Sequence, residues 1–454
     1  MASATSSKIP SELSPVLDFV DANSSRFVED LRELIRQPSI SAQDKGVKEC
    51  AELLQRKMVE AGIDARIMPT ARHPVVFGEV KGKSAKKTLL FYGHYDVQPP
   101  EPLEEWKSPP FAAEVRDGKI YGRGASDMKC GVMALVKGME AYLKVHGSVP
   151  INAKYIFEGE EEIGSPSLEQ FVKDNKALLK ADARVAYDGT SDVSLGSKGM
   201  LQVQLTVKED RPDFHSREAG ILVSPIWRLV WALNTFKDQK EKVLIDGFYD
   251  DFKEPTPEDE ALLEQLPLNP EELYSGRLLD GLDTKMKLFR RRLFSPTCNI
   301  SGIISGYTGT GSKTVLPRLA SARVDFRLVA DQDPDDIFEK LKRHMVKQGF
   351  GDIEVTKTGQ LWPSRTHPSA AVARTVMISS EMAHQHKVTV TPVHAGSGPS
   401  YIFTRNLNLP FAYTGAATTS SCNHSPNEFV RPQDYVAGIK KAAAICYNFS
   451  RFAE

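Results

Sequence analysis

The stretch Lys87-Thr-Leu-Leu-Phe-Tyr-Gly-His-Tyr-Asp-Val-Gln-Pro99 joins a short apolar run to polar residues that follow it directly. A run such as residues 87–92, closed by Gly93, is typical of a strand that is buried on both faces of a sheet. In open α/β sheets, binding sites form beyond the carboxyl ends of the strands. The stretch therefore predicts a central strand with His94 and Asp96 at a candidate site.

Further elements on either side of this strand predict the rest of one layer. Residues 16–61 mix apolar and charged positions at helical spacing, which predicts two amphipathic helices. Residues 128–146 carry apolar side chains on one helical face, and residues 151–157 and 183–186 resemble buried strands. Because strands and helices alternate, we expect an α/β domain with a mostly parallel central sheet flanked by helices.

The pattern changes near residue 200. Residues 201–207 and 320–328 alternate with period two, which is typical of half-exposed antiparallel strands. Because 454 residues exceed the size of a usual single core, we predict an inserted α+β domain at 200–361 with an antiparallel sheet. It interrupts a catalytic domain formed by 1–199 and 362–454. Residues 250–283 are rich in acidic residues and proline, which favours a solvated excursion.

Composition excludes several classes of protein. The chain has 58 Lys and Arg against 59 Asp and Glu, so a strongly basic nucleic-acid surface or a polybasic membrane anchor is not expected. Five scattered cysteines without a C-x-x-C pair argue against a disulfide framework or a thiolate zinc site. The first residues have no apolar signal core, and no stretch is long and apolar enough to span a bilayer. We therefore expect a cytoplasmic protein that binds neither nucleic acid nor membrane.

Five short motifs place imidazole and carboxylate groups near predicted strand ends. These ligand types suit zinc, manganese or cobalt in a hydrolytic site with an open coordination position. The sequence thus favours a hydrolytic metal site. The motifs are Gly93-His-Tyr-Asp-Val-Gln-Pro99, Gly122-Arg-Gly-Ala-Ser-Asp-Met-Lys129, Glu158-Gly-Glu-Glu-Glu-Ile-Gly-Ser165, Ala186-Tyr-Asp-Gly189 and Cys422-Asn-His-Ser-Pro-Asn-Glu428.

Each motif alone also has a structural explanation. His94 could be a hydrogen-bonded core histidine, and Asp127 could be the N-cap of the following helix. The acidic run 158–162 could be a solvated loop, and Asp188 with Gly189 could form an ordinary turn. The metal-site hypothesis gains weight because the acidic and imidazole groups recur at four separate strand ends.

In these motifs and their order, the chain resembles the dinuclear zinc exopeptidases. That family includes carboxypeptidase G, acetylornithine deacetylase, succinyl-diaminopimelate desuccinylase and the cytosolic and carnosine-type dipeptidases. The similarity extends over nearly the whole chain. It implies hydrolysis by a water that bridges two divalent ions in each subunit. We expect Zn²⁺, with Mn²⁺ and Co²⁺ as alternatives.

The resemblance also implies roles for individual residues of the motifs. Asp127 matches the carboxylate that bridges the two ions. His94 and Asp188 match further ligands of one ion, and Glu162 and His424 match further ligands of the other. By the same comparison, Glu161 corresponds to the general base, and Asp96 corresponds to a carboxylate that orients His94.

Substrate-binding residues are implied in the second half of the chain. His215 is similar to a histidine that reaches across a homodimer to stabilise the oxyanion, which implies that the inserted domain at 200–361 is a lid and dimerisation domain. Arg327 resembles an arginine that pairs with a substrate carboxylate, although a strand arginine is often simply solvated. Thr314 and Ser397 resemble residues that position the backbone and bind a carboxylate.

Two positions depart from the family pattern and affect the expected substrate preference. Arg217 and Cys130 stand where the family commonly has glycine. Neither replaces an expected ligand.

The residue at position 188 favours one branch of the family. In having aspartate at this position, the chain resembles the dipeptidases and aminopeptidases of the family. Carboxypeptidases and deacylases usually have glutamate there. We therefore predict a metallo-dipeptidase acting on small peptides. The alternative within the family is an N-acyl-amino-acid deacylase or carboxypeptidase, and a metal-free binding protein is an alternative from another class.

Overall fold

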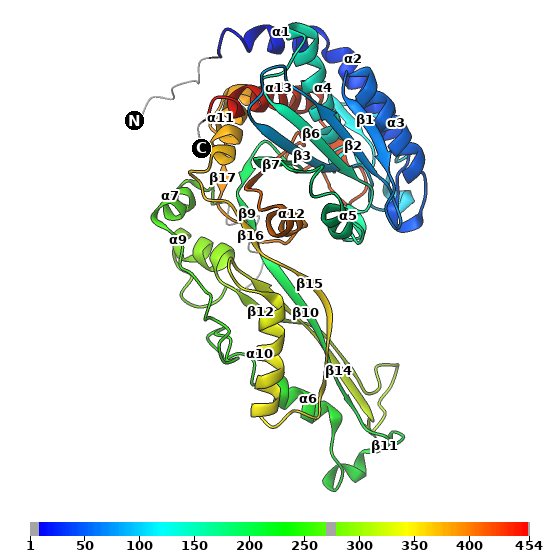
Figure 1. The fold of residues 1–454 in the computed structure, drawn as a ribbon. Coiled ribbons are helices and arrows are strands. Elements are labelled where there is room, and N and C mark those ends of the chain that lie inside the picture. The colour runs from blue at the N-terminus through cyan, green and yellow to red at the C-terminus, as the bar shows by residue number, and fades with distance from the viewer. Residues whose placement is uncertain (1–8, 269–277, 453–454) are drawn as a thin grey trace.

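The computed structural model describes residues 9–268 and 278–452 (Figure 1). The part of the 250–283 excursion at 269–277 lies outside these residues. Two lobes are visible in Figure 1, an upper one with helices packed around a sheet and a lower one with long strands. Within the described ranges, no helix has both the length and the apolar content needed to cross a membrane.

The upper lobe contains the mostly parallel sheet that the sequence predicts. Its strands are ordered β1-β2-β6-β3-β7-β18-β8-β17. β3 lies between β6 and β7 and is parallel to both, and β18 is parallel to β7, while β1 and β2 add antiparallel pairings at one edge. The strands are β1 (Asp64–Met68), β2 (Val75–Val80), β3 (Thr88–His94), β6 (Asn152–Glu158), β7 (Ala183–Tyr187), β8 (Val193–Ser194), β17 (Val390–Thr391) and β18 (Phe411–Thr414).

Strand β3 shows why this sheet is apolar on both faces. Leu89 and Phe91 pack into one hydrophobic core, whereas Leu90 and Tyr92 pack into another on the opposite face. Side chains alternate between the two faces of a strand, so a strand covered on both sides needs apolar residues at nearly every position. The first face is covered by α1 (Ser14–Ala22), α2 (Ser24–Arg36), α3 (Val47–Glu60), α4 (Lys129–His146), α11 (Ala371–His384) and α13 (Pro432–Phe449), and the second by α5 (Leu168–Asp174) and α12 (Ser400–Leu407).

The prediction of two helices over residues 16–61 is wrong in number, because the structure has three. α1 and α2 are separated only by Asn23, whose side chain donates a hydrogen bond to the carbonyl of Phe19 at 2.9 Å. A break of one residue leaves the spacing of the apolar residues nearly unchanged. The sequence pattern therefore does not indicate that the helix is divided at Asn23.

The lower lobe is built on an antiparallel sheet ordered β12-β14-β10-β15. Leu201, Val203 and Leu205 alternate into a core of their own, as the period-two pattern predicts. Helices α6 and α10 cover this core (Figure 1). These elements are β10 (Gly199–Lys208), β12 (Thr297–Ser305), β14 (Leu319–Leu328), β15 (Glu354–Leu361), α6 (Pro225–Leu233) and α10 (Pro334–Lys347).

The predicted solvated excursion is partly a packed structure. α7 (Pro257–Gln265) begins with a capping box between Thr256 and Asp259. Just after the excursion, α9 (Lys285–Phe289) continues into a π-helical turn at Arg290–Phe294. Apolar side chains of these segments form a cluster with Val393, so the excursion contacts the C-terminal part of the chain. Because residues 250–283 are rich in acidic residues and proline, their composition does not indicate the buried cluster.

Several short strands complete the described structure. They form one three-stranded and two two-stranded sheets, and Ile120 and Val430 of the three-stranded sheet belong to the core of the upper lobe. They are β4 (Glu114–Arg116), β5 (Lys119–Tyr121), β9 (Gly196–Ser197), β11 (Phe214–His215), β13 (Val315–Leu316), β16 (Ser364–Arg365) and β19 (Phe429–Val430).

Candidate metal centre

Asp127 lies at the centre of the candidate site, in the loop that leads into α4. Its Oδ1 is 3.2 Å from Nε2 of His94, and its Oδ2 is 3.1 Å from Nε2 of His424. One carboxylate therefore faces two histidines that come from distant parts of the chain. This geometry suits a carboxylate shared by two metal ions.

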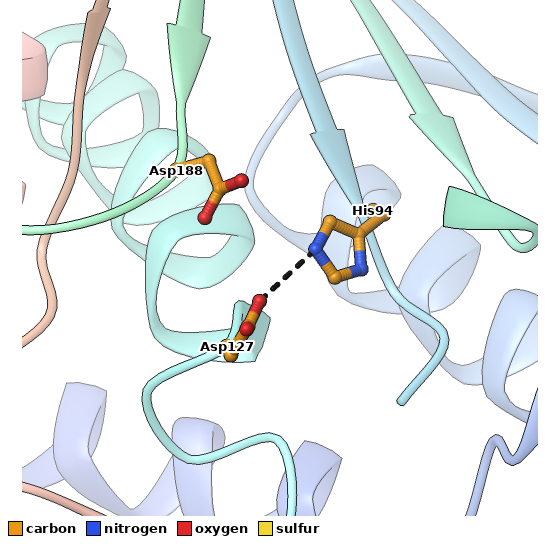
Figure 2. Close-up of side chains that lie close together, drawn as sticks. All are labelled: His94, Asp127 and Asp188. Atoms are coloured by element: carbon orange, nitrogen blue, oxygen red, sulfur yellow. Dashed lines mark ion pairs between the residues drawn. The ribbon is translucent and has the colours of Figure 1, made fainter. Parts of the chain in front are cut away.

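The first group of candidate ligands contains His94, Asp127 and Asp188. His94 ends β3, and Asp188 follows β7, so neighbouring parallel strands deliver both side chains to one edge of the sheet. Figure 2 shows all three side chains turned toward one another. Their ligand atoms lie within 4.8 Å of one another, close enough to hold one metal ion.

The second group contains Asp127, Glu162 and His424. Nε2 of His424 is 3.2 Å from Oε2 of Glu162, and the ligand atoms of all three residues again lie within 4.8 Å of one another. Glu162 belongs to the short 3₁₀ turn Glu161–Ile163 that follows β6. The two groups share Asp127, so together they offer two adjacent metal sites.

The charges in the two groups also suit bound cations. Burial raises the pKa of Asp188 to about 6, and the nearby carboxylate of Asp127 adds to this effect. Hydrogen bonds to Asp127 and Glu162 raise the pKa of His424 to about 10. The crowded carboxylates thus favour positive charge on a neighbouring histidine. Bound divalent ions would supply that positive charge instead. Imidazole and carboxylate donors suit Zn²⁺, Mn²⁺ or Co²⁺.

Asp96 is buried behind the first group and connects it to the acidic turn. Its carboxylate lies 3.4 Å from Nδ1 of His94 and accepts hydrogen bonds from the backbone N–H groups of Glu161 and Glu162 at 3.2 and 3.1 Å. A carboxylate on the second ring nitrogen fixes the orientation of a ligand histidine. Asp96 can therefore position His94 and the turn together.

Glu428 is a buried residue whose position sequence reasoning missed. Its carboxylate accepts hydrogen bonds from the backbone N–H groups of Gly124, Ser126 and Asp127 and from Nη1 of Arg123, at 2.7 to 3.0 Å. These bonds hold the loop that carries Asp127. Glu428 follows His424 in the fifth motif, but no local pattern indicates that a glutamate beside a turn is buried.

We expect Glu428→Gln to weaken metal binding by about 10- to 100-fold, because the support of a metal ligand is lost. Glutamine keeps the shape but loses the charge that accepts four hydrogen bonds. Titration of the metal-free protein with Zn²⁺ or Mn²⁺ measures the change. The exposed Glu52→Gln is the matched control, and unchanged affinity in Glu428→Gln would contradict the positioning role.

Glu161 lies beside the ligands without belonging to either group. Burial raises its pKa to about 7, and the carboxylates of Asp188 and Glu162 act in the same direction, against the charge of His94. It lines a cavity of about 540 Å³ together with Asp188, Asn423 and Ser397. Its placement suits a group that exchanges protons with a molecule in the cavity.

Arg327 contacts the lining of this cavity through Ser397. Nη1 of Arg327 donates a hydrogen bond to Oγ of Ser397 at 2.8 Å, and Ser397 lines the cavity. The cavity lining therefore includes carboxylates of the candidate metal centre and a serine that is bonded to a guanidinium.

Comparison with known proteins identifies the family. Residues 90–448 match the family described as Peptidase family M20/M25/M40. This chain belongs to that family. The resemblance inferred from the five motifs is thereby confirmed, and the protein is a hydrolase of the peptidase class.

Relatives of this M20 chain include dipeptidases and a carboxypeptidase. It is 27% identical to the Beta-Ala-His dipeptidase of Rattus norvegicus, over 97% of this chain and 96% of the rat protein. It is 26% identical to the Cys-Gly metallodipeptidase of Candida albicans, over 99% of both chains. A crystal structure of the M20 family metallo-carboxypeptidase Sso-CP2 from Sulfolobus solfataricus is 36% identical, with a TM-score of 0.86, over 94% of this chain and 99% of the other.

Two predicted site residues of the M20 chain lie away from the metal centre. His215 lies in β11 and Thr314 directly precedes β13, with Nε2 of His215 3.4 Å from Oγ1 of Thr314. Figure 1 places β11 at the far tip of the lower lobe. Within one chain, these residues are therefore not brought to the two metal groups.

The two departures from the family pattern also lie outside the cavity lining. The backbone N–H of Arg217 donates to Nδ1 of His215 at 3.2 Å, and its side chain pairs with Glu218. Cys130 is buried in α4, where its thiol contacts the carbonyl of Ser126 at 3.3 Å, in the loop that ends at Asp127. Neither side chain belongs to a candidate metal group.

Proposed function

We propose that this M20 peptidase is a dinuclear metallo-dipeptidase. The observation that carries the proposal is the pair of ligand groups that share Asp127, with Glu161 beside them in the same cavity. In this assignment, His94 and Asp188 complete one metal site, and Glu162 and His424 complete the other. Two full-length dipeptidase relatives support the choice of substrate class.

The reaction follows from the positions of the side chains. Bound divalent ions would polarise the scissile carbonyl and lower the pKa of a water molecule. Glu161 removes a proton from the attacking water and transfers it to the leaving amine. Arg327 and Ser397 bind the carboxylate of the substrate in the same cavity. The substrate is thus held with its C-terminal residue toward Arg327.

A carboxypeptidase is the second candidate, because the relative from Sulfolobus solfataricus is 36% identical and is named as one. Both activities need a free substrate carboxylate, so Arg327 serves either. They differ at the amino end of the substrate. Turnover of Ala-Ala, N-acetyl-Ala-Ala and Ala-Ala-Ala by enzyme loaded with Zn²⁺, Mn²⁺ or Co²⁺ distinguishes them. A dipeptidase prefers Ala-Ala, whereas preference for the longer or blocked peptides would contradict the proposal.

We also propose that residues 200–361 form the lid and the dimer interface. α6 exposes Trp227 and Trp231, with 58% and 55% of their surface accessible. β12 is an edge strand of its sheet and exposes Ile303 and Ile304. An apolar surface beside an unpaired strand edge favours association with a second copy. Such a dimer would allow His215 of one subunit to reach the cavity of the other.

Mixing two inactive variants tests this exchange between subunits. We expect His215→Ala and Glu161→Gln each to have low activity, because each removes one catalytic group. A mixed dimer has one cavity with both intact groups, so about half of the wild-type activity per mixed dimer should return. Separation of tagged mixed dimers before the assay makes the comparison quantitative, and absence of recovery in them would contradict a contribution from the partner subunit.

Zn²⁺ is the ion we propose for both sites, on the basis of the mixed imidazole and carboxylate ligands. We further propose a cytoplasmic location. Its support is that all five cysteines are free, which fits a reducing compartment.

A further inference from the structure

Positive charge accumulates at one end of the cavity. His394 and Ser397 line this end, and Arg327 contacts Ser397. Behind them lies Lys198, which is only 2% exposed. Its backbone N–H donates to the carbonyls of His394 and Gly396 at 3.2 and 3.0 Å. The backbone of Lys198 thus holds the loop that contributes His394 and Ser397 to the cavity lining.

The turn at Arg290–Phe294, before β12, lies against this loop. The ammonium group of Lys198 donates to the carbonyl oxygens of Arg292 and Ser295, both at 2.7 Å. Leu293 and Phe294 pack in a cluster with Val393, the residue before His394. These contacts hold the backbone of the exposed Arg292 next to the loop that contributes His394 to the cavity lining.

No acidic partner balances these cations among residues 9–268 and 278–452. Within those ranges, Lys198, Arg292 and Arg327 form no ion pair with an aspartate or glutamate. Burial and the charges of Arg291, Arg327 and Arg292 lower the pKa of Lys198 to about 8. Burial and the charges of Arg292 and Arg327 also lower the pKa of His394. Like charges held together in this way favour an anionic ligand.

One carboxylate does not account for this much positive charge. In the proposed dipeptidase, Arg327 pairs with the α-carboxylate of the substrate. We propose that Arg292 recognises a second carboxylate, so that the enzyme prefers dipeptides whose C-terminal residue is glutamate or aspartate. This inference rests on the proposed orientation of the substrate, with its C-terminal residue toward Arg327.

The test compares Ala-Glu with Ala-Gln, which have nearly the same shape but differ in charge. We expect kcat/KM of the wild-type enzyme to be about tenfold higher for Ala-Glu than for Ala-Gln. A factor of this size corresponds to the contribution of one charged hydrogen bond. Arg292→Gln should bring this ratio close to one, and Arg292→Glu should reverse it. Arg290→Gln is the matched control, because Arg290 pairs with Glu260 at 2.6 Å, and it should keep the wild-type ratio.

A wild-type ratio near one, or a ratio that Arg292→Gln leaves unchanged, would overturn the inference. Failure of the dipeptidase assignment gives a different result. In that case N-acetyl-Glu and N-acetyl-Gln are hydrolysed in place of both dipeptides, and their ratio then tests Arg292. Calorimetric binding of free glutamate and glutamine to metal-loaded wild type and Arg292→Gln makes the same comparison without turnover.

Discussion

Glu161→Gln is expected to lower kcat by about 10²- to 10⁴-fold, the usual contribution of a general base, while the metal content stays unchanged. Glutamine has the size of glutamate but cannot accept the proton of the attacking water. Glu161 belongs to neither ligand group, so its replacement removes no metal ligand. Steady-state kinetics on Ala-Ala and metal analysis of the same sample measure both quantities.

The adjacent Glu162 provides the matched control. Glu162→Gln alters a residue of the second ligand group, so it should lower the content of one metal ion as well as the activity. The two variants differ by one position on the same short turn. If Glu161→Gln also lost metal, or if it kept wild-type kcat, the general-base assignment would be wrong.

The sequence predicts the upper lobe well because its signals are local. The run 87–92 is apolar at nearly every position, and β3 is indeed covered on both faces. The alternation of residues 201–207 likewise corresponds to β10, with one face of the strand in a core. In both cases the spacing of apolar residues along one strand contains the information.

Other features depend on contacts between distant residues and could not be predicted in this way. The packing of α7 and the 290–294 turn against Val393 joins segments about a hundred residues apart. Glu428 is buried because the loop before Asp127 surrounds its carboxylate, some three hundred positions earlier in the chain. In both cases, the sequence around one segment contains no pattern that indicates which distant segment it contacts.

The candidate ligands are partly predictable from local patterns and partly dependent on contacts between distant residues. Parallel strands end at the same edge of a sheet, so the sequence predicts that His94 and Asp188 lie near each other once β3 and β7 are neighbours. The structure brings both to Asp127. His215 is different, because its predicted role requires a second subunit. Its position at the tip of the lower lobe agrees with that requirement without testing it.

Asp127→Asn is expected to have the largest effect of any single substitution, because Asp127 is the one residue shared by both ligand groups. Asparagine keeps the shape but removes the charge that faces His94 and His424 at 3.2 and 3.1 Å. Both ions should therefore bind more weakly, and kcat/KM should fall by about 10³-fold or more, since metal ions contribute several kcal/mol to such reactions. Asp188→Asn alters only the first group and should mainly lower the content of one ion. Metal analysis after dialysis separates the two cases, and an Asp127→Asn enzyme that retained two ions would show that the sites do not depend on a shared carboxylate.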